Sequence, residues 1–259
     1  NTYTITWDKT AQASNYKHGK DSLGKLEVTE KSIKDGDNMS VSTPSDVEYD
    51  GKEHKWEPEV KDGDKVLVKG TDYTVSYSKE DFTNVTGEIT VTITGIGNYK
   101  GTVIKTYKIT PATYTVTTLG AEKTYDGTPL TNAEGATVNG LKNGEEVTLK
   151  VTGSQTEVGS SDNTYTIAWD KTAQESNYTH GKDSLGKLTV TEKSIEDGEN
   201  MSVSTPSDIE YDGKEHKWEP EVKDGDKVLA KGTDYAVSYS KTDFTNVTGV
   251  ITVTITGTG

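Results

Sequence analysis

The sequence predicts an all-β protein made of small β-sandwich modules in tandem, arranged as an elongated array. Residues 1–97 return without a gap as residues 163–259, and 85 of the 97 positions are identical. A fixed period over most of a chain is typical of a repeat protein. Apolar residues alternate with polar ones, which is the period of a β-strand, and turn residues separate these runs about every 8 to 12 positions.

Residues 1–33 are expected to hold the closing part of a first module type, here called type A. Residues 3–7 alternate Tyr, Ile and Trp with threonine, which predicts a strand. Asp8 then favours one capped helical turn over residues 9–13. Leucine and valine alternate with polar side chains over residues 25–29, so a second strand is expected there.

Residues 34–111 are expected to form a complete module of a second type, type B. Turns are predicted where Gly, Asp and Asn cluster, at residues 35–38, 49–51, 61–64 and 98–101. Alternating stretches between the turns predict strands or a shared buried face, at Val41 and residues 54–60, 66–68, 73–77, 87–94 and 103–109. Pro111 should then end sheet pairing.

The rest of the chain continues the alternation of types. Residues 112–195 are expected to form a complete type A module, and residues 196–259 a type B module without its last strand. In both types a Tyr-Asp-Gly turn precedes an Asn-Tyr pair, by 50 residues in type B and by 53 in type A. We therefore expect one fold for both types. The alternative is a β-grasp module, with the turn at residues 170–174 as its one short helix.

Composition excludes several classes of function. The chain has 42 acidic and 28 basic residues and a net charge of −14, and it contains no arginine. Nucleic-acid binding needs clustered positive charge, so no nucleic-acid partner is expected. Without cysteine, neither disulfides nor thiolate metal sites can hold the fold. No apolar run approaches the roughly 18 residues of a membrane span, so we expect no membrane insertion in this part of the protein.

No constellation of side chains points to catalysis, and we expect no enzymatic activity, no catalytic residue and no cofactor. The histidines form no pair with metal-binding spacing and are His18, His54, His180 and His216. Residues 153–157 lack the second glycine of a nucleophile elbow. The glycine-rich residues 95–101 precede a predicted strand, whereas a phosphate loop precedes a helix, so we expect a hairpin turn there.

Residue types suggest three further sites, and each of these residues also has a simpler structural explanation. The aspartates of residues 35–38 and 62–64 could bind Ca²⁺, although solvated turns are the default and we expect no metal. Trp56 and Trp218 could form a sugar platform or anchor the core. An isopeptide bond between a lysine and an asparagine is a further alternative. The sequence does not identify its partners, because the bond forms between buried side chains.

Four motifs carry a resemblance to a known family. They are Tyr-Asp-Gly at 49–51, Gly-Thr-Asp-Tyr at 70–73, Gly-Ile-Gly-Asn-Tyr-Lys-Gly at 95–101 and Tyr-Lys-Ile-Thr-Pro-Ala at 107–112. With these, nearly the whole chain resembles the YDG/MBG-type and bacterial Ig-like repeats of secreted, cell-wall-anchored adhesins of Gram-positive bacteria. The resemblance implies Ig-like modules and an extracellular place at the cell surface. Its motifs are turns and strand edges, so it implies no activity.

The function expected from these observations is structural. A module copied with little change is suited to set length, so the repeats would form a stalk that projects a binding head from the cell wall. The alternative is that each period presents a weak site for a host glycan or protein and that repetition supplies avidity. The incomplete ends also suggest head-to-tail self-association, in which residues 26–29 of one chain add to the open edge beside residues 252–255 of another.

Overall fold

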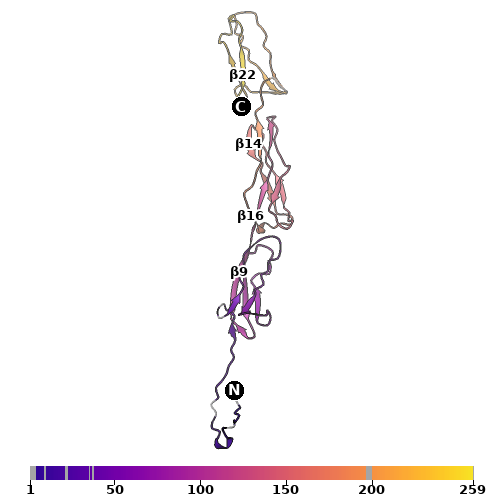
Figure 1. Ribbon diagram of the computed structural model, residues 1–259. Coiled ribbons are helices and arrows are strands. Elements are labelled where there is room, and N and C mark those ends of the chain that lie inside the picture. Colours follow the sequence, from indigo (N-terminus) through magenta and orange to yellow (C-terminus); the bar gives the residue numbers. More distant parts are fainter. Residues whose placement is uncertain are drawn as a thin grey trace. The chain divides into compact units, whose positions relative to one another are not determined.

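The protein is all-β, as predicted, in a computed structural model that describes residues 4–8, 10–20, 23–34, 36, 38–196 and 200–258 (Figure 1). Besides strands, these residues form two three-residue 3-10 turns, η1 (Ala13–Asn15) and η2 (Glu175–Asn177). The chain divides into two compact units. The first contains residues 1–113, 140–145 and 173–179, and the second contains residues 114–139, 146–172 and 180–259.

The strands before Pro111 all belong to the first unit. They are β1 (Lys31–Ser32), β2 (Met39–Val41), β3 (Val47–Glu48), β4 (Val60–Asp62), β5 (Lys65–Val66), β6 (Tyr73–Tyr77), β7 (Glu88–Gly95), β8 (Tyr99–Lys100) and β9 (Thr102–Thr110).

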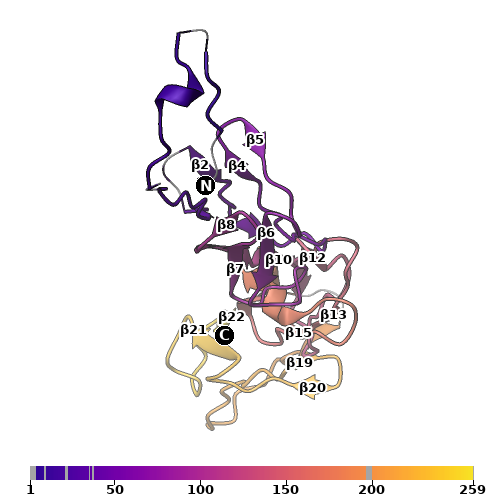
Figure 2. The ribbon, with the colours of Figure 1, turned by 90° about the horizontal axis from the view of Figure 1, so that it is seen from below.

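The long strand β9 organises the larger sheet of the first unit. The sheet has the order β3-β9-β7-β6. The strands β2, β4 and β5 form a second sheet and lie beside one another in Figure 2. β9 runs antiparallel to β7, with Tyr107 opposite Ile89, and parallel to β3, with Ile109 opposite Val47. β9 therefore joins the end of the module to its beginning.

Alternation in β7 and β9 builds the core of this unit. Ile89, Val91 and Ile93 are fully buried on one face of β7, and the threonines between them are not. Tyr107 and Ile109 of β9 are buried on the same side. A strand with one buried face has a fixed register, because a slip of one residue would turn every apolar side chain to water.

Three tyrosines of the sheet hold the segment of residues 54–58, which has no strand of its own. Their hydroxyls donate to its carbonyl oxygens at 2.9 to 3.1 Å, from Tyr107 to His54, from Tyr77 to Trp56 and from Tyr73 to Pro58. The Trp56 N–H donates to the Tyr107 hydroxyl at 3.3 Å. The face predicted for this segment is confirmed, since residues 54, 56, 58 and 60 are each less exposed than their neighbours.

The strands after Pro111 lie mainly in the second unit. They are β10 (Ala112–Thr117), β11 (Ala121–Thr124), β12 (Thr137–Asn139), β13 (Thr148–Val151), β14 (Gly159–Asp162), β15 (Tyr165–Ala168), β16 (Tyr178–His180), β17 (Lys187–Thr191), β18 (Met201–Val203), β19 (Val222–Asp224), β20 (Lys227–Val228), β21 (Tyr235–Tyr239) and β22 (Val253–Gly257).

The Tyr-Asp-Gly turn occupies the same place in both module types. β11 pairs in parallel with the closing strand β17, as β3 does with β9. The residue after the first strand of each pair, Tyr125 or Tyr49, donates its backbone N–H at 2.8 Å, to the carbonyl of Thr191 or Thr110. This shared pairing supports the prediction that the two types have one fold.

The strands predicted in the first 33 residues are wrong where the structure describes them. Residues 4–7 and 25–29 form no strand, although the copies of residues 4–6 and 25–29 lie in β15 and β17. In the second unit β15 pairs with β13, and β17 lies between β11 and β14. In the first copy, the described residues of these segments pair with no strand.

The predicted helical segments are also wrong. Asp8 does accept the backbone N–H of Thr10 and Ala11, at 2.8 and 3.2 Å, but η1 begins only at Ala13. In the later copy η2 begins at Glu175, after the predicted segment 170–174. A three-residue turn cannot cover a sheet, so the described residues contain no helix of the kind that a β-grasp module requires.

Candidate functional site

The first unit contains a joint between residues 34–111 and two loops of the following type A sequence. Tyr49 follows β3, Glu145 lies in the loop between β12 and β13, and Tyr178 begins β16. Both phenol hydroxyls donate to the Glu145 carboxylate, that of Tyr178 at 2.6 Å. The two rings meet edge to face at 5.5 Å between centroids. One carboxylate thus ties together tyrosines 129 positions apart in the sequence.

A buried asparagine makes the second half of this joint. Asn177 is fully buried, and its side-chain oxygen accepts the backbone N–H of Val85 at 2.8 Å. Its amide nitrogen donates to Asn84 Oδ1 at 2.8 Å. Asp81 fixes Asn84 in turn by accepting its side-chain and backbone N–H groups. A buried amide with both ends paired specifies one geometry, because any displacement would leave its groups unsatisfied.

Burial and the nearby carboxylate change the acidity of both phenols. Burial, followed by the hydrogen bond to Glu145, raises the pKa of Tyr49 to about 12. The same causes, in the same order, raise the pKa of Tyr178. Both hydroxyls are therefore neutral donors at physiological pH, which is the form that the Glu145 carboxylate needs.

A second kind of joint occurs in both copies where type A sequence passes into type B. Lys31 Nζ lies 2.5 Å from Asp62 Oδ1, and in the later copy Lys193 Nζ lies 2.5 Å from Asp224 Oδ1. The Lys31 ammonium holds the pKa of the Asp62 carboxyl below its usual value, and the Tyr99 hydroxyl donates to that carboxyl at 3.2 Å. This contact recurs with the period of the repeat.

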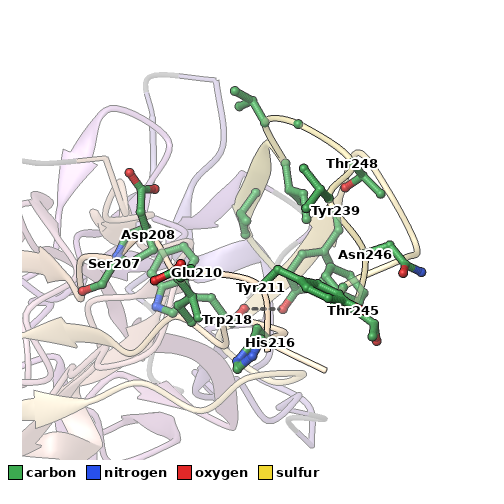
Figure 3. Close-up of a pocket in the computed structure, with 18 residues that line it drawn as sticks. Ser207, Asp208, Glu210, Tyr211, His216, Trp218, Tyr239, Thr245, Asn246 and Thr248 are labelled. Atoms are coloured by element: carbon green, nitrogen blue, oxygen red, sulfur yellow. Dashed lines mark hydrogen bonds between the residues drawn. The ribbon is translucent and has the colours of Figure 1, made fainter. Parts of the chain in front are cut away.

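One cavity lies in the second copy of the type B sequence, in the second unit. It has a volume of about 560 Å³ and is lined by residues 206–211, His216, Trp218, Tyr239, residues 244–251 and Val253. Figure 3 shows these side chains, with the Tyr239 hydroxyl donating to the Trp218 carbonyl oxygen at 2.9 Å. We call this cavity the β22 groove, because it runs beside the strand that is last in the described sequence.

The candidate residues from the sequence do not gather at one site. Each of three histidines pairs with an aspartate three or four residues away, with Nε2 to Oδ1 distances of 2.6 to 2.9 Å, in the pairs His54–Asp50, His180–Asp183 and His216–Asp212. His18 is exposed. Tyr165 joins His180 and Asp183 by its hydroxyl, at 3.1 and 2.6 Å. These pairs are local contacts that stabilise turns. Among the described residues, no three His, Asp or Glu side chains are placed to hold a metal.

The glycine-rich and aspartate-rich stretches form turns. Residues 95–101 join β7 to β9 through β8, and the Gly95 N–H donates to the Gly101 carbonyl at 2.9 Å, so the predicted hairpin turn is confirmed. Gly63 adopts a positive φ of 57° between β4 and β5. Asp62 beside it is engaged by Lys31 and Tyr99, as described above. Residues 35 and 37 of the other aspartate turn lie outside the described residues.

The remaining candidates have structural surroundings. The Trp56 and Trp218 side chains are half-buried, and the backbone of each is held by sheet tyrosines. For an isopeptide bond, the buried polar side chains of the described residues are Asp72, Thr118, Asn163 and Asn177, with no lysine among them. Within 153–157, Ser154 is exposed and Gln155 exchanges backbone hydrogen bonds with Leu130.

Sequence reasoning missed the joint, although one signal for it was present. Tyr49 was used only as a turn marker, and the Asn-Tyr pair at 177–178 only as a landmark for spacing. Both motifs recur unchanged in the two copies, with Asn15 and Tyr16 as the earlier pair. Glu145 lies in the part of the period that occurs once, so no repetition could have drawn attention to it.

Comparisons with known proteins add no assignment: no family model, no curated protein and no solved structure matches this chain. Over the described residues, no helix is long and apolar enough to cross a lipid bilayer.

Proposed function

We propose that this chain is a structural segment of an extracellular, cell-wall-anchored adhesin, in which alternating modules act as a stalk for a binding head. The role is mechanical and requires no catalytic residue or cofactor. The resemblance of the Tyr-Asp-Gly and Asn-Tyr motifs to bacterial surface repeats supports the location. The proposal covers the repeats only and leaves the ligand of the head open.

The observation that carries the proposal is the joint around Glu145. A stalk holds its head at a fixed distance only if each module is coupled to the next by contacts of fixed geometry. The paired amide of Asn177 and the two phenols on Glu145 supply such contacts within the first unit. Inter-domain contacts within a chain otherwise resemble transient interfaces, for which relative motion is the default expectation.

The recurrence of the lysine-aspartate joint supports the same role. It is formed once at Lys31–Asp62 and again at Lys193–Asp224, with the same distance. In a repeat array each unit contacts only its neighbours, so copying a period adds length without disturbing the contacts of the others.

Solution scattering on the whole chain tests the stalk. A module of about 80 residues has a diameter near 30 Å, so three modules in line reach roughly 100 Å, whereas one globule of this length would span about 50 Å. We expect a maximum dimension near the larger value, and an increase of about 60 Å when one further 162-residue period is inserted. A dimension near 50 Å would contradict the proposal.

A glycan array distinguishes the alternative, in which every period is itself a weak receptor. The chain with one period and the chain with an inserted period are compared on the same surface. Avidity would strengthen binding by orders of magnitude with copy number. A stalk segment should bind no better with two periods than with one.

A further inference from the structure

The loop that holds Glu145 carries a dipeptide with a chemistry of its own. Asn143 and Gly144 form an Asn-Gly pair, and the sequence contains one other such pair, Asn139–Gly140. In an Asn-Gly pair the glycine nitrogen can attack the asparagine side chain, because glycine has no side chain to shield its amide. Each pair can therefore lose the side-chain amide group spontaneously, and its surroundings decide whether the reaction occurs.

Asn143 and Gly144 lie at the exposed tip of a tight turn. The Glu145 N–H closes the turn by donating to the Lys142 carbonyl oxygen at 2.9 Å. Both central residues are exposed and have a left-handed backbone, with φ of 51° and 71°. Among the described residues, and apart from its chain neighbours, no heavy atom lies within 4 Å of the position that a Cβ on Gly144 would take. Solvent therefore has access to Gly144.

The two asparagines are held to different extents. Asn139 is the last residue of β12, lies opposite Thr115 of β10, and donates from Nδ2 to Thr117 Oγ1 at 3.2 Å. Asn143 belongs to no strand, and its Nδ2 donates to the Gly51 carbonyl oxygen at 3.3 Å. The attack requires rotation of the asparagine backbone and side chain. That rotation breaks the end of a strand pairing at Asn139, whereas at Asn143 it breaks one long hydrogen bond of the side chain.

The turn is fixed to the same tyrosine on both sides of Asn143. On one side the Lys142 N–H donates to the Tyr178 hydroxyl at 2.9 Å. On the other side the Glu145 carboxylate accepts the Tyr178 hydroxyl at 2.6 Å and also accepts that of Tyr49. The length of main chain between Lys142 and Glu145 therefore decides whether these contacts can form together.

We propose that Asn143 is a site of spontaneous deamidation and that the reaction opens the Glu145 joint. The backbone nitrogen of Gly144 attacks Asn143 Cγ, the Cγ–Nδ2 bond breaks, and ammonia leaves with the proton of the attacking nitrogen. The product is a cyclic succinimide. Water then adds to either carbonyl carbon of the ring and reopens it, which gives aspartate or isoaspartate at position 143. This reaction depends on the geometry of the loop and not on a stalk role.

Both products disturb the joint, and isoaspartate does so more strongly. Either product replaces the amide that donates to the Gly51 carbonyl oxygen by a carboxylate, so that one acceptor faces another. The new negative charge also lies two positions from Glu145 in the sequence, and like charges repel. In isoaspartate the main chain runs through Cβ and Cγ and is longer by one atom. The contacts of Lys142 and Glu145 with Tyr178 then no longer fit together.

Ageing of the whole chain in mildly alkaline buffer tests the proposal. The products carry one more negative charge than the parent, so anion exchange separates them, and mass spectrometry of peptides locates the modified residue. In heavy-oxygen water each event should incorporate a single heavy oxygen atom. We expect conversion at Asn143 well ahead of Asn139. The rate should rise with hydroxide concentration, because the attacking nitrogen must lose its proton.

Amide hydrogen exchange on the separated forms measures the joint. The amides of Lys142 and Val85 should exchange at least about tenfold faster in the isoaspartate form than in the parent, because both donate to groups of the joint. Residues 89–93 of β7 should keep their rates, since they lie in the core of the same unit. The matched control is Asn143→Gln, whose longer side chain closes a ring far more slowly. Its exchange rates should be the same before and after ageing.

Each part of the proposal has a result that would overturn it. Conversion at Asn139 before Asn143, or no conversion at Asn143, would overturn the assignment of the site. Unchanged exchange at Lys142 and Val85 in the separated isoaspartate form would overturn the effect on the joint. If the aged Asn143→Gln variant showed the same faster exchange, another modification would be its cause and the proposal would be wrong.

Discussion

Replacing Tyr49 by phenylalanine should loosen the Glu145 joint without altering the fold. The ring is buried and meets Tyr178 edge to face, and phenylalanine keeps both features. Only the hydroxyl that donates to Glu145 is lost. Tyr178 still donates to the same carboxylate, so the charge keeps one phenol partner.

The expected magnitude follows from the charge on the acceptor. A hydrogen bond to an ionised group contributes about 1.5 to 3 kcal/mol, which corresponds to roughly a 10- to 150-fold change in an opening equilibrium. The repeat supplies a matched control, Tyr211→Phe. Tyr211 has the same neighbours in sequence, but its side chain is mostly exposed, and exposed substitutions usually change stability by less than about 0.5 kcal/mol.

Amide hydrogen exchange at two positions reports the opening of the joint directly. The Lys142 N–H donates to the Tyr178 hydroxyl at 2.9 Å, and the Val85 N–H donates to Asn177. In Tyr49→Phe both amides should exchange about 10- to 100-fold faster, whereas in Tyr211→Phe they should change less than about twofold. If the two variants behaved alike, or if these amides exchanged freely in the parent chain, the joint as described would be refuted.

Two further predictions concern the same joint. Gly51→Ala should destabilise the first unit more than Gly213→Ala destabilises the second. Both glycines have a positive φ, of 74° and 76°. An added Cβ at Gly51 would lie 2.6 Å from Asn143 Cβ, whereas at Gly213 the nearest atom is 3.9 Å away. Each variant loses about 1 to 2 kcal/mol from strain, and urea unfolding should show the additional loss for Gly51→Ala alone. The stability difference between the parent chain and Tyr49→Phe should also disappear at high pH. Folding raises the pKa of Tyr49 to about 12 from an unfolded value near 10, so the contribution is complete below about pH 10 and is lost as the pH rises towards 12. Unfolding midpoints of both chains measured from pH 8 to 12 check this, and a gap that widened with pH would contradict it.

The sequence predicted best those elements whose partners lie nearby in the chain. β7 and β9 were expected from alternation alone, and the hairpin between them from its glycines. The two strands pair in one sheet and bury their apolar side chains on the same side, so local pattern and tertiary structure agree. The face of residues 54–60 was also predicted, although the tyrosine hydroxyls that hold it belong to strands 15 to 53 positions further along.

The failures arise where a segment depends on partners that are remote in the sequence. Residues 25–29 and 187–191 have nearly the same text, but only the later copy is a strand, because β11 and β14 flank it. The alternation of apolar and polar residues shows that a segment can form a strand, but the segment becomes a strand only where a neighbouring strand edge is present to pair with it. The joint was missed for a related reason. Nothing local in a loop marks Glu145 as the acceptor for two phenols that are distant in sequence.

The two joints share one construction. In each, the tyrosine of an Asn-Tyr pair donates to a carboxylate of its own module: Tyr178 to Glu145, and Tyr99 to Asp62. That carboxylate then receives a group from the preceding module. Asp62 receives the ammonium of Lys31, and Glu145 receives the phenol of Tyr49. The construction is shared, but the incoming group is a cation in one joint and a neutral donor in the other.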